Sequence, residues 1–342
     1  MKALVLQEAK KLEVTEINLP ELKPNEVLIK VMAAGVCGTD LHLYEGEEGA
    51  TASTLPLILG HEFSGIIEKL GNDVADYACG DRVCVDPNLY CGECDNCKCG
   101  NVQYCTHAQA YGVTRFGGFA QYCIVNTKVL YKIPDSLSYE GAALVEMIAC
   151  CLHGIDRTDI QIGDTVAIIG FGSVGQAMFQ LSKLSGVAKV IVIEPNEEKR
   201  KLAIKMGAYL CVDPVNENAC DKIAHSRIRS VDKVIECSGN IHAMHSALEI
   251  ASKGATVMLF GLSAPQSKLT VLPFEQVFRK ELIITSSFVN PLCTQRVIDM
   301  LENKVLDIES IITDKIALKD SISVFTDSHY RTRGKIIILP NA

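Results

Sequence analysis

The sequence lacks a long apolar run, a secretion signal and any block of charge of one sign. Its longest apolar stretch, GAALVEMIACCLHGI, is short and is interrupted by Glu146, which argues against a membrane span. The N-terminus MKALVLQEAKK has no hydrophobic region with a cleavage site, so we expect a cytoplasmic protein. A net charge of -8 and the absence of a basic stripe argue against nucleic acid as a partner.

No internal repeat or low-complexity segment is visible, and 342 residues are enough for two domains with proper cores. Hydrophobic residues make up 48% and charged residues 22%, which is typical of a globular protein. The 15 cysteines are an unusual number. Without a secretion signal they predict reduced thiols and metal sites rather than a disulfide framework.

The hydrophobic pattern changes about two fifths of the way along the chain. Segments such as LEVTEINLP, EVLIKVMAAGVC and FAQYCIVN predict short strands separated by turns, with no long helical period before about residue 138. From SLSYEGAALVEM onward, strands such as TVAIIG and KVIVIE alternate with segments of helical period. This alternation is typical of βαβ units, so we predict a β-rich domain followed by a doubly wound parallel sheet.

A glycine-rich turn predicts a dinucleotide site. GFGSVG follows the strand TVAIIG directly and opens a helix, the context in which G-x-G-x-x-G has meaning. Gly170 permits the tight turn, Gly172 lets the backbone approach a pyrophosphate, and Gly175 lets helix and sheet pack closely. Ser173 and Val174 begin the helix, whose N–H groups favour phosphate.

The next strand ends in an acid that favours NAD over NADP. Glu194 lies 19 residues after Gly175, where a carboxylate accepts hydrogen bonds from ribose hydroxyls and repels a 2′-phosphate. Lys199 and Arg200 follow and weaken that preference. We also expect cofactor contacts from the turn after ATVMLFG, which contains Gly261, Leu262 and Ser263.

A cysteine-rich segment predicts a structural zinc site. CGECDNCKCGNVQYC places Cys91, Cys94, Cys97 and Cys105 at a spacing suited to a closed tetrahedral site. The metal would hold a lobe, residues 88–106, that has too little apolar content to fold by itself. Cys99 is a spare thiol, and an iron–sulfur cluster or redox disulfides are the competing interpretations.

Three separate segments, VCGTDLH, GHEFSG and LVEM, contain candidate ligands for a second metal. Cys37 and His61 suit zinc, and Glu62 and Glu146 are carboxylates that could complete or flank the site. Glu146 lies in an apolar helix start, where burying a bare carboxylate is costly unless a cation is near.

These motifs, over essentially the whole chain, resemble the zinc-containing medium-chain dehydrogenase/reductase family. GDRVCVDP, GGFAQY and ELIITSSFVNP are most similar to its polyol and threonine dehydrogenase branch. The resemblance implies a GroES-like catalytic domain over residues 1–147 and 289–342, with a Rossmann NAD-binding domain over residues 148–288.

The resemblance also assigns roles by position. Cys37 and His61 would bind catalytic zinc, and Glu62 and Glu146 would be its third ligand and a further ligand or water-holder, in an order left open. Thr39 matches the hydroxyl that bonds the substrate oxygen, and His42 the distal end of a proton relay. Met147 stands where polyol dehydrogenases usually have proline.

The resulting hypothesis is a zinc- and NAD-dependent dehydrogenase of a secondary alcohol, most simply a polyol. L-Threonine or a sugar-alcohol phosphate is an alternative substrate, and a non-catalytic binding or structural protein on the same fold is an alternative of another class. The resemblance further implies a homodimer or homotetramer.

Overall fold

The computed structural model describes residues 1–47 and 53–342. It divides into two compact units, Met1–Ala149 with Asn290–Ala342, and Cys150–Val289. No helix among the described residues is long and apolar enough to cross a bilayer. None of the fifteen cysteines, all of which are described, forms a disulfide.

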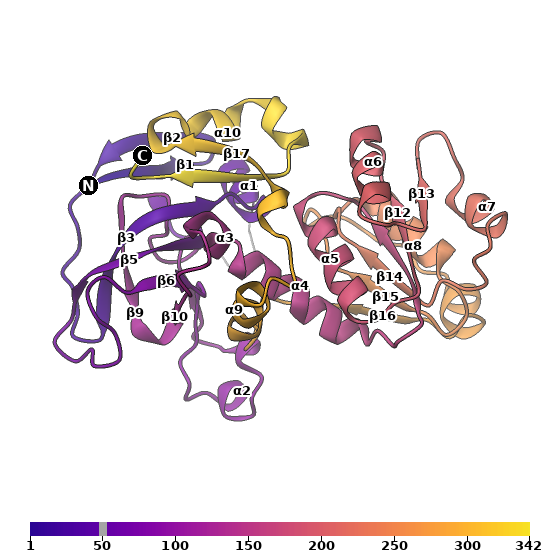
Figure 1. The fold of residues 1–342 in the computed structure, drawn as a ribbon, viewed down its shortest axis with the longest axis horizontal. Coiled ribbons are helices and arrows are strands. Elements are labelled where there is room, and N and C mark those ends of the chain that lie inside the picture. The colour runs from indigo at the N-terminus through magenta and orange to yellow at the C-terminus, as the bar shows by residue number, and fades with distance from the viewer. Residues whose placement is uncertain (48–52) are drawn as a thin grey trace. The chain divides into compact units, whose positions relative to one another are not determined.

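The first unit is built on mostly antiparallel strands, with β17 and β18 paired in parallel (Figure 1). Its larger sheet has the order β10-β6-β5-β3-β18-β17, with β9 also paired to β3, beside a three-stranded sheet β2-β1-β4 and the pair β7-β8. The strands are β1 (Lys2–Glu8), β2 (Lys11–Glu16), β3 (Glu26–Gly35), β4 (Leu57–Ile58), β5 (Glu62–Leu70), β6 (Arg82–Val85), β7 (Asn88–Leu89), β8 (Gln109–Ala110), β9 (Tyr122–Asn126), β10 (Leu130–Lys132), β17 (Ile312–Ala317) and β18 (Lys335–Leu339). The helices are α1 (Gly38–Glu45), α2 (Asp95–Lys98), α3 (Tyr139–Ala143), α9 (Thr294–Glu302) and α10 (Ile322–Thr326), and α4 (Val145–Thr158) begins in this unit and continues into the second.

Strand β3 is central to this unit because it pairs with β5, β9 and β18. Its residues are almost all buried, and Val27, Ile29 and Val31 belong to the main core cluster. β18 comes from the end of the chain, so the C-terminal segment completes a sheet begun at the N-terminus. This pairing brings residues near position 335 beside residues near positions 35 and 62.

The second unit is a parallel sheet with helices on both faces. Its strands are β11 (Thr165–Ile169), β12 (Lys189–Ile193), β13 (Leu210–Val212), β14 (Lys233–Glu236), β15 (Thr256–Leu259) and β16 (Ile283–Ser286). Its helices are α5 (Ser173–Leu184), α6 (Glu197–Lys205), α7 (Ala219–Ala224) and α8 (Ile241–Ile250), followed by a π-helix over Pro273–Phe278. The order β13-β12-β11-β14-β15-β16 is the 3-2-1-4-5-6 order of the Rossmann fold, as predicted. Helices α5 and α6 pack against β11, β12 and β13, and α8 packs against β14, β15 and α7.

Local sequence explains most of these elements. Asn196, Asn218 and Asn240 each accept a backbone N–H bond as the N-cap of a helix in the second unit. Ser138 caps α3 in the same way, and α4 follows directly after α3. Helix α1 was not expected from the strand-like pattern of the first third of the sequence.

Candidate active site and metal centres

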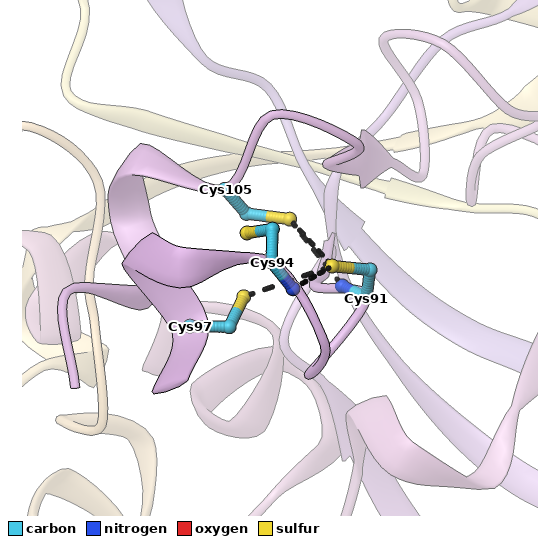
Figure 2. Close-up of side chains that lie close together, drawn as sticks. All are labelled: Cys91, Cys94, Cys97 and Cys105. Atoms are coloured by element: carbon cyan, nitrogen blue, oxygen red, sulfur yellow. Dashed lines mark hydrogen bonds between the residues drawn. The ribbon is translucent and has the colours of Figure 1, made fainter. Parts of the chain in front are cut away.

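The four-cysteine lobe brings its thiols together (Figure 2). The sulfur atoms of Cys91, Cys94, Cys97 and Cys105 all lie within 4.8 Å of one another. Cys91 Sγ is 3.5 Å from Cys105 Sγ and 3.9 Å from Cys97 Sγ. A tetrahedral zinc with bonds of about 2.3 Å would separate its sulfur ligands by about 3.8 Å, so the thiols fit that ion.

Backbone N–H groups favour the thiolate forms of Cys91 and Cys94, whereas burial raises the pKa of Cys97 to about 12. The amides of Glu93 and Cys94 donate to Cys91 Sγ at 3.4 and 3.3 Å. Backbone N–H bonds, first from Cys97, lower the pKa of Cys94 to about 6. Cys99 is exposed at the end of α2 and is not in the group, and no residue of α2 is buried. The lobe therefore has a ligand set but no apolar core of its own.

A second group of candidate metal ligands comes from two of the three segments that the sequence analysis identified, VCGTDLH and GHEFSG. Cys37 is the N-cap of α1, His61 precedes β5, and Glu62 begins β5. Ligand atoms of these three residues lie within 4.8 Å of one another. Among the described residues, this trio and the cysteine lobe are the groups of three or more His, Cys, Asp or Glu side chains that meet this criterion.

A buried carboxylate, Asp40, lies beside the histidine of this group. The Asp40 side chain is fully buried and accepts backbone N–H bonds from Cys37 and Gly60. Its Oδ1 lies 3.6 Å from His61 Nδ1, which is close enough for an ion pair but too far for a hydrogen bond, and this buried nitrogen has no hydrogen-bond partner. Burial would lower the pKa of His61, but the nearby Asp40 and Cys37 outweigh it and raise this pKa well above its ordinary value.

Glu62 uses one carboxylate oxygen in a buried ion pair, and its other oxygen has no hydrogen-bond partner. Lys335 Nζ donates to Glu62 Oε1 at 2.5 Å, with both side chains buried. Glu62 Oε2 is buried and has no hydrogen-bond partner. A buried, unpaired carboxylate oxygen is costly, and a zinc ion coordinated by Cys37, His61 and Glu62 would remove that cost. The residues present therefore fit a zinc ion.

Glu146 is placed differently from Glu62. It is buried in the first turn of α4, yet it is not part of the group formed with Cys37 and His61. It is close enough to Lys335 for its charge to contribute to raising the pKa of that lysine. The carboxylate that the structure brings to the trio is thus Glu62, and Glu146 lies near its ion-pair partner.

The predicted relay residues share α1 with Cys37. Thr39 Oγ1 lies 3.9 Å from Cys37 Sγ. His42 is one turn further along, and its Nδ1 is 2.5 Å from Glu47 Oε2. Residues three apart lie on one side of a helix, so Thr39 and His42 follow the same face away from the metal-binding trio.

In the second unit, the glycine turn has the geometry that the sequence predicted. Gly170 has a φ of +90°, which favours glycine. A Cβ at Gly175 would lie 2.1 Å from the Gly170 carbonyl oxygen, whereas a Cβ at Gly172 would meet nothing within 4 Å. Ser173 and Val174 are the first residues of α5. The turn therefore packs closely on one side and leaves an open cradle on the other.

Glu194 directly follows β12 and is buried against this turn. Its Oε2 accepts the N–H of Phe171 at 2.6 Å, and its Oε1 accepts the N–H of Asn196 at 2.9 Å. The Arg200 guanidinium donates to main-chain carbonyls and pairs with Asp213 at 3.0 Å. The Arg200 guanidinium therefore already has hydrogen-bond and ion-pair partners within the protein.

The remaining predicted cofactor residues lie at the same edge of the sheet or just beyond it. Gly261, Leu262 and Ser263 follow β15, and Lys199 is in the first turn of α6 after β12. The carboxyl ends of parallel strands form the ligand edge of such a fold. A Cβ at Gly261 would lie 2.1 Å from the backbone nitrogen of Gly239, so two turns pack tightly there.

Three residues at these sites were missed in the sequence. Asp40 lies inside CGTDLH, and its position beside His61 depends on folding. Lys335 lies in GKIIILP, which reads as an ordinary strand. Glu236 ends β14 and accepts N–H bonds from Ser238 and Gly239, and burial raises its pKa. The acid-after-strand pattern that identified Glu194 could have found Glu236.

Comparison with known proteins agrees with this architecture. Residues 23–135 match the alcohol dehydrogenase GroES-like domain, and residues 173–303 match the zinc-binding dehydrogenase domain. The chain is 34% identical to sorbitol dehydrogenase of Bacillus subtilis (strain 168), covering 94% of this chain and 91% of the relative. It is 32% identical to D-arabitol-phosphate dehydrogenase of Enterococcus avium, with coverages of 95% and 93%. It is 31% identical to L-threonine 3-dehydrogenase of Bacillus velezensis, with coverages of 99% and 99%.

Among solved structures, a chain assigned as a zinc-binding dehydrogenase from Sinorhizobium meliloti 1021, bound to NADP, superposes with a TM-score of 0.94. It is 36% identical, and the match covers 99% of each chain. The protein therefore belongs to the zinc-containing medium-chain dehydrogenases, in their polyol and threonine dehydrogenase branch. It is an oxidoreductase with a GroES-like domain and a Rossmann domain, as the resemblance implied.

Proposed function

We propose that this protein oxidises a secondary alcohol, a polyol, with zinc in its active site and NAD as the hydride acceptor. The observation that carries the proposal is the convergence of Cys37, His61 and Glu62 within 4.8 Å, with Glu62 Oε2 buried and unpaired. A zinc ion held there supplies Lewis acidity toward the alcohol oxygen. The sorbitol dehydrogenase relative supports a polyol, and the arabitol-phosphate and threonine dehydrogenase relatives support the two alternative substrates.

The protein's own groups would handle the substrate proton. Thr39 Oγ1 would accept a hydrogen bond from the substrate hydroxyl and pass its own proton onward. His42 suits the end of this path because a histidine changes charge near neutral pH. If Nδ1–H donates to Glu47, the Nε2 of His42 is left to accept the proton. His42→Ala should slow turnover less than Thr39→Ala, because water can replace a terminal acceptor that is partly exposed.

The NAD preference rests on Glu194 and on the engagement of Arg200. A buried carboxylate at the ribose position would accept hydrogen bonds from the hydroxyls and repel a 2′-phosphate. Arg200, the nearest arginine in the sequence, already pairs with Asp213. Lys199 remains as the cation that could favour NADP, and the Sinorhizobium meliloti relative was solved with NADP.

We also propose that the protein is a homodimer or homotetramer. β16 is at the edge of its sheet, and its Ile283 and Ile284 side chains are 59% and 37% exposed. Phe274 and Phe278, which precede this strand, are 62% and 77% exposed. An exposed apolar edge strand is a liability in a monomer and is stabilised by pairing.

Two measurements test the enzymatic proposal. Metal analysis should find two zinc ions per chain, and turnover should be seen when polyols, polyol phosphates and L-threonine are screened with NAD and with NADP. One zinc per chain would account for the cysteine lobe alone and would contradict a catalytic metal. If two zinc ions are found but only L-threonine is turned over, then the substrate is L-threonine rather than a polyol, and the proposed mechanism is unchanged.

A further inference from the structure

The ion pair between Lys335 and Glu62 crosses a strand. Glu62 is on β5 and Lys335 is on β18, and both strands flank β3 in the sheet. Gly35, the last residue of β3, pairs with Glu62 on one side and with Ile337 on the other. The ammonium group therefore reaches over the end of β3 to meet the carboxylate.

Gly35 makes this crossing possible. A Cβ there would lie 2.3 Å from Glu62 Oε2, 3.2 Å from Lys335 Cε and 3.3 Å from Glu62 Cβ. Each distance is shorter than ordinary van der Waals contact, and the shortest is to the carboxylate oxygen that has no hydrogen-bond partner. Because Gly35 has no side chain, it leaves a gap, and the Lys335 stem and the Glu62 carboxylate fill this gap together.

The two carboxylate oxygens of Glu62 have different environments. Lys335 holds Oε1 at 2.5 Å, and Oε2 has no hydrogen-bond partner among the described residues. Lys335 is 4% exposed and Glu62 is fully buried, so little solvent competes for either group. An ion pair so enclosed fixes the direction of the carboxylate, because rotation would break it and leave two buried charges unpaired.

We infer that Lys335 is a positioning residue for the catalytic metal: through the Gly35 gap it fixes Glu62 so that Oε2 alone is presented with Cys37 and His61. This inference rests on the proposed function. It adds that a lysine from the far end of the chain, rather than a ligand itself, determines how the glutamate binds. Groups that orient metal ligands typically change metal affinity about 10- to 100-fold when they are removed.

The test measures zinc retention rather than turnover. Wild type and Lys335→Met would be dialysed against graded chelator, and the zinc remaining per chain would be counted. We expect Lys335→Met to lose one zinc at an about 10- to 100-fold lower chelator concentration. The zinc of the cysteine lobe should be lost at the same concentration in both proteins, which makes it an internal reference. Lys335→Arg, which keeps the charge, should restore most of the retention.

Lys315→Met is the matched control. Lys315 is on the neighbouring strand β17 and forms an ion pair of the same length, 2.5 Å, with Glu140. Its side chain is 51% exposed, and its partner is outside the metal-binding trio. This variant should retain both zinc ions as wild type does. Gly35→Ala should resemble Lys335→Met, because its Cβ would displace Glu62 Oε2.

A double variant separates positioning from general stabilisation. If Lys335 acts through Glu62, then adding Lys335→Met to Glu62→Gln should weaken zinc retention no further. Cobalt substituted for zinc adds a spectroscopic check, since its visible absorption should change in Lys335→Met and be unchanged in Lys315→Met. Wild-type retention in Lys335→Met, or additive losses in the double variant, would overturn this inference alone. A wild-type protein with only the lobe zinc would overturn the proposed function as well.

Discussion

Replacing Glu194 with glutamine should weaken the discrimination between NAD and NADP. The Glu194 carboxylate is 5% exposed and accepts two backbone N–H bonds, at 2.6 and 2.9 Å. A 2′-phosphate carries a charge of about -1.5 to -2 near neutral pH, so its approach to Glu194 is repulsive.

The size of the effect follows from Coulomb's law. Two unit charges about 4 Å apart repel by about 4 kcal/mol at an effective dielectric constant of about 20. Since about 1.4 kcal/mol corresponds to a factor of ten, the carboxylate can contribute up to about 10³-fold against NADP. Glutamine also loses a charged hydrogen bond to the ribose, which costs about 1.5–3 kcal/mol and lowers kcat/KM for NAD by about 10- to 100-fold.

The assay is kcat/KM for each cofactor at a fixed alcohol concentration, followed at the nicotinamide absorbance. Glu197→Gln is the matched control, because it removes the same charge from a 70% exposed side chain at the start of α6. We expect its cofactor ratio to stay within about twofold of wild type, since exposed charges are screened. An unchanged ratio in Glu194→Gln, or a wild-type enzyme that prefers NADP, would refute the reasoning.

Three further predictions concern the other parts of the two sites. Thr39→Ala should lower kcat by about 10²- to 10³-fold while the Kd for NAD is unchanged, and Thr39→Ser should retain activity; full kcat in the alanine variant would remove Thr39 from the proton path. Cys94→Ser should remove one zinc ion per chain and make residues 88–106 sensitive to protease, while the circular dichroism of the whole protein stays nearly unchanged. A lobe that stays resistant to protease would show that the metal is not needed to fold it. Gly175→Ala should lower the free energy of unfolding by about 1–3 kcal/mol, because its Cβ would lie 2.1 Å from the Gly170 carbonyl oxygen. Gly172→Ala has open space around its Cβ and should keep wild-type stability while weakening cofactor binding. Equal denaturation midpoints for the two variants would contradict this prediction.

The sequence predicted the parts of this protein whose chemistry is local. Four cysteines within fifteen residues can meet through turns of one segment, so their spacing alone indicated the lobe. The Rossmann unit was predictable because strand, glycine turn, helix and acid follow one another along the chain. Helix α1 was missed because eight residues carry little periodic signal, and its start depends on Asp40, whose carboxylate accepts the N–H of Cys37.

The third ligand of the proposed catalytic zinc was left open by the sequence, and strand pairing in the tertiary structure places the candidates. Glu62 and Glu146 were equivalent carboxylates in the sequence, separated by more than eighty residues. Pairing of β3 with β5 brings Glu62 to the trio, and pairing of β3 with β18 brings Lys335 to its second oxygen. No local pattern marks Gly35 or Lys335, because a gap in one strand has meaning only when its two neighbours are known. The sequence by itself therefore identified the residue types that can bind zinc and a dinucleotide. Which oxygen of Glu62 is left without a partner was determined by the long-range pairing of β3 with β5 and β18.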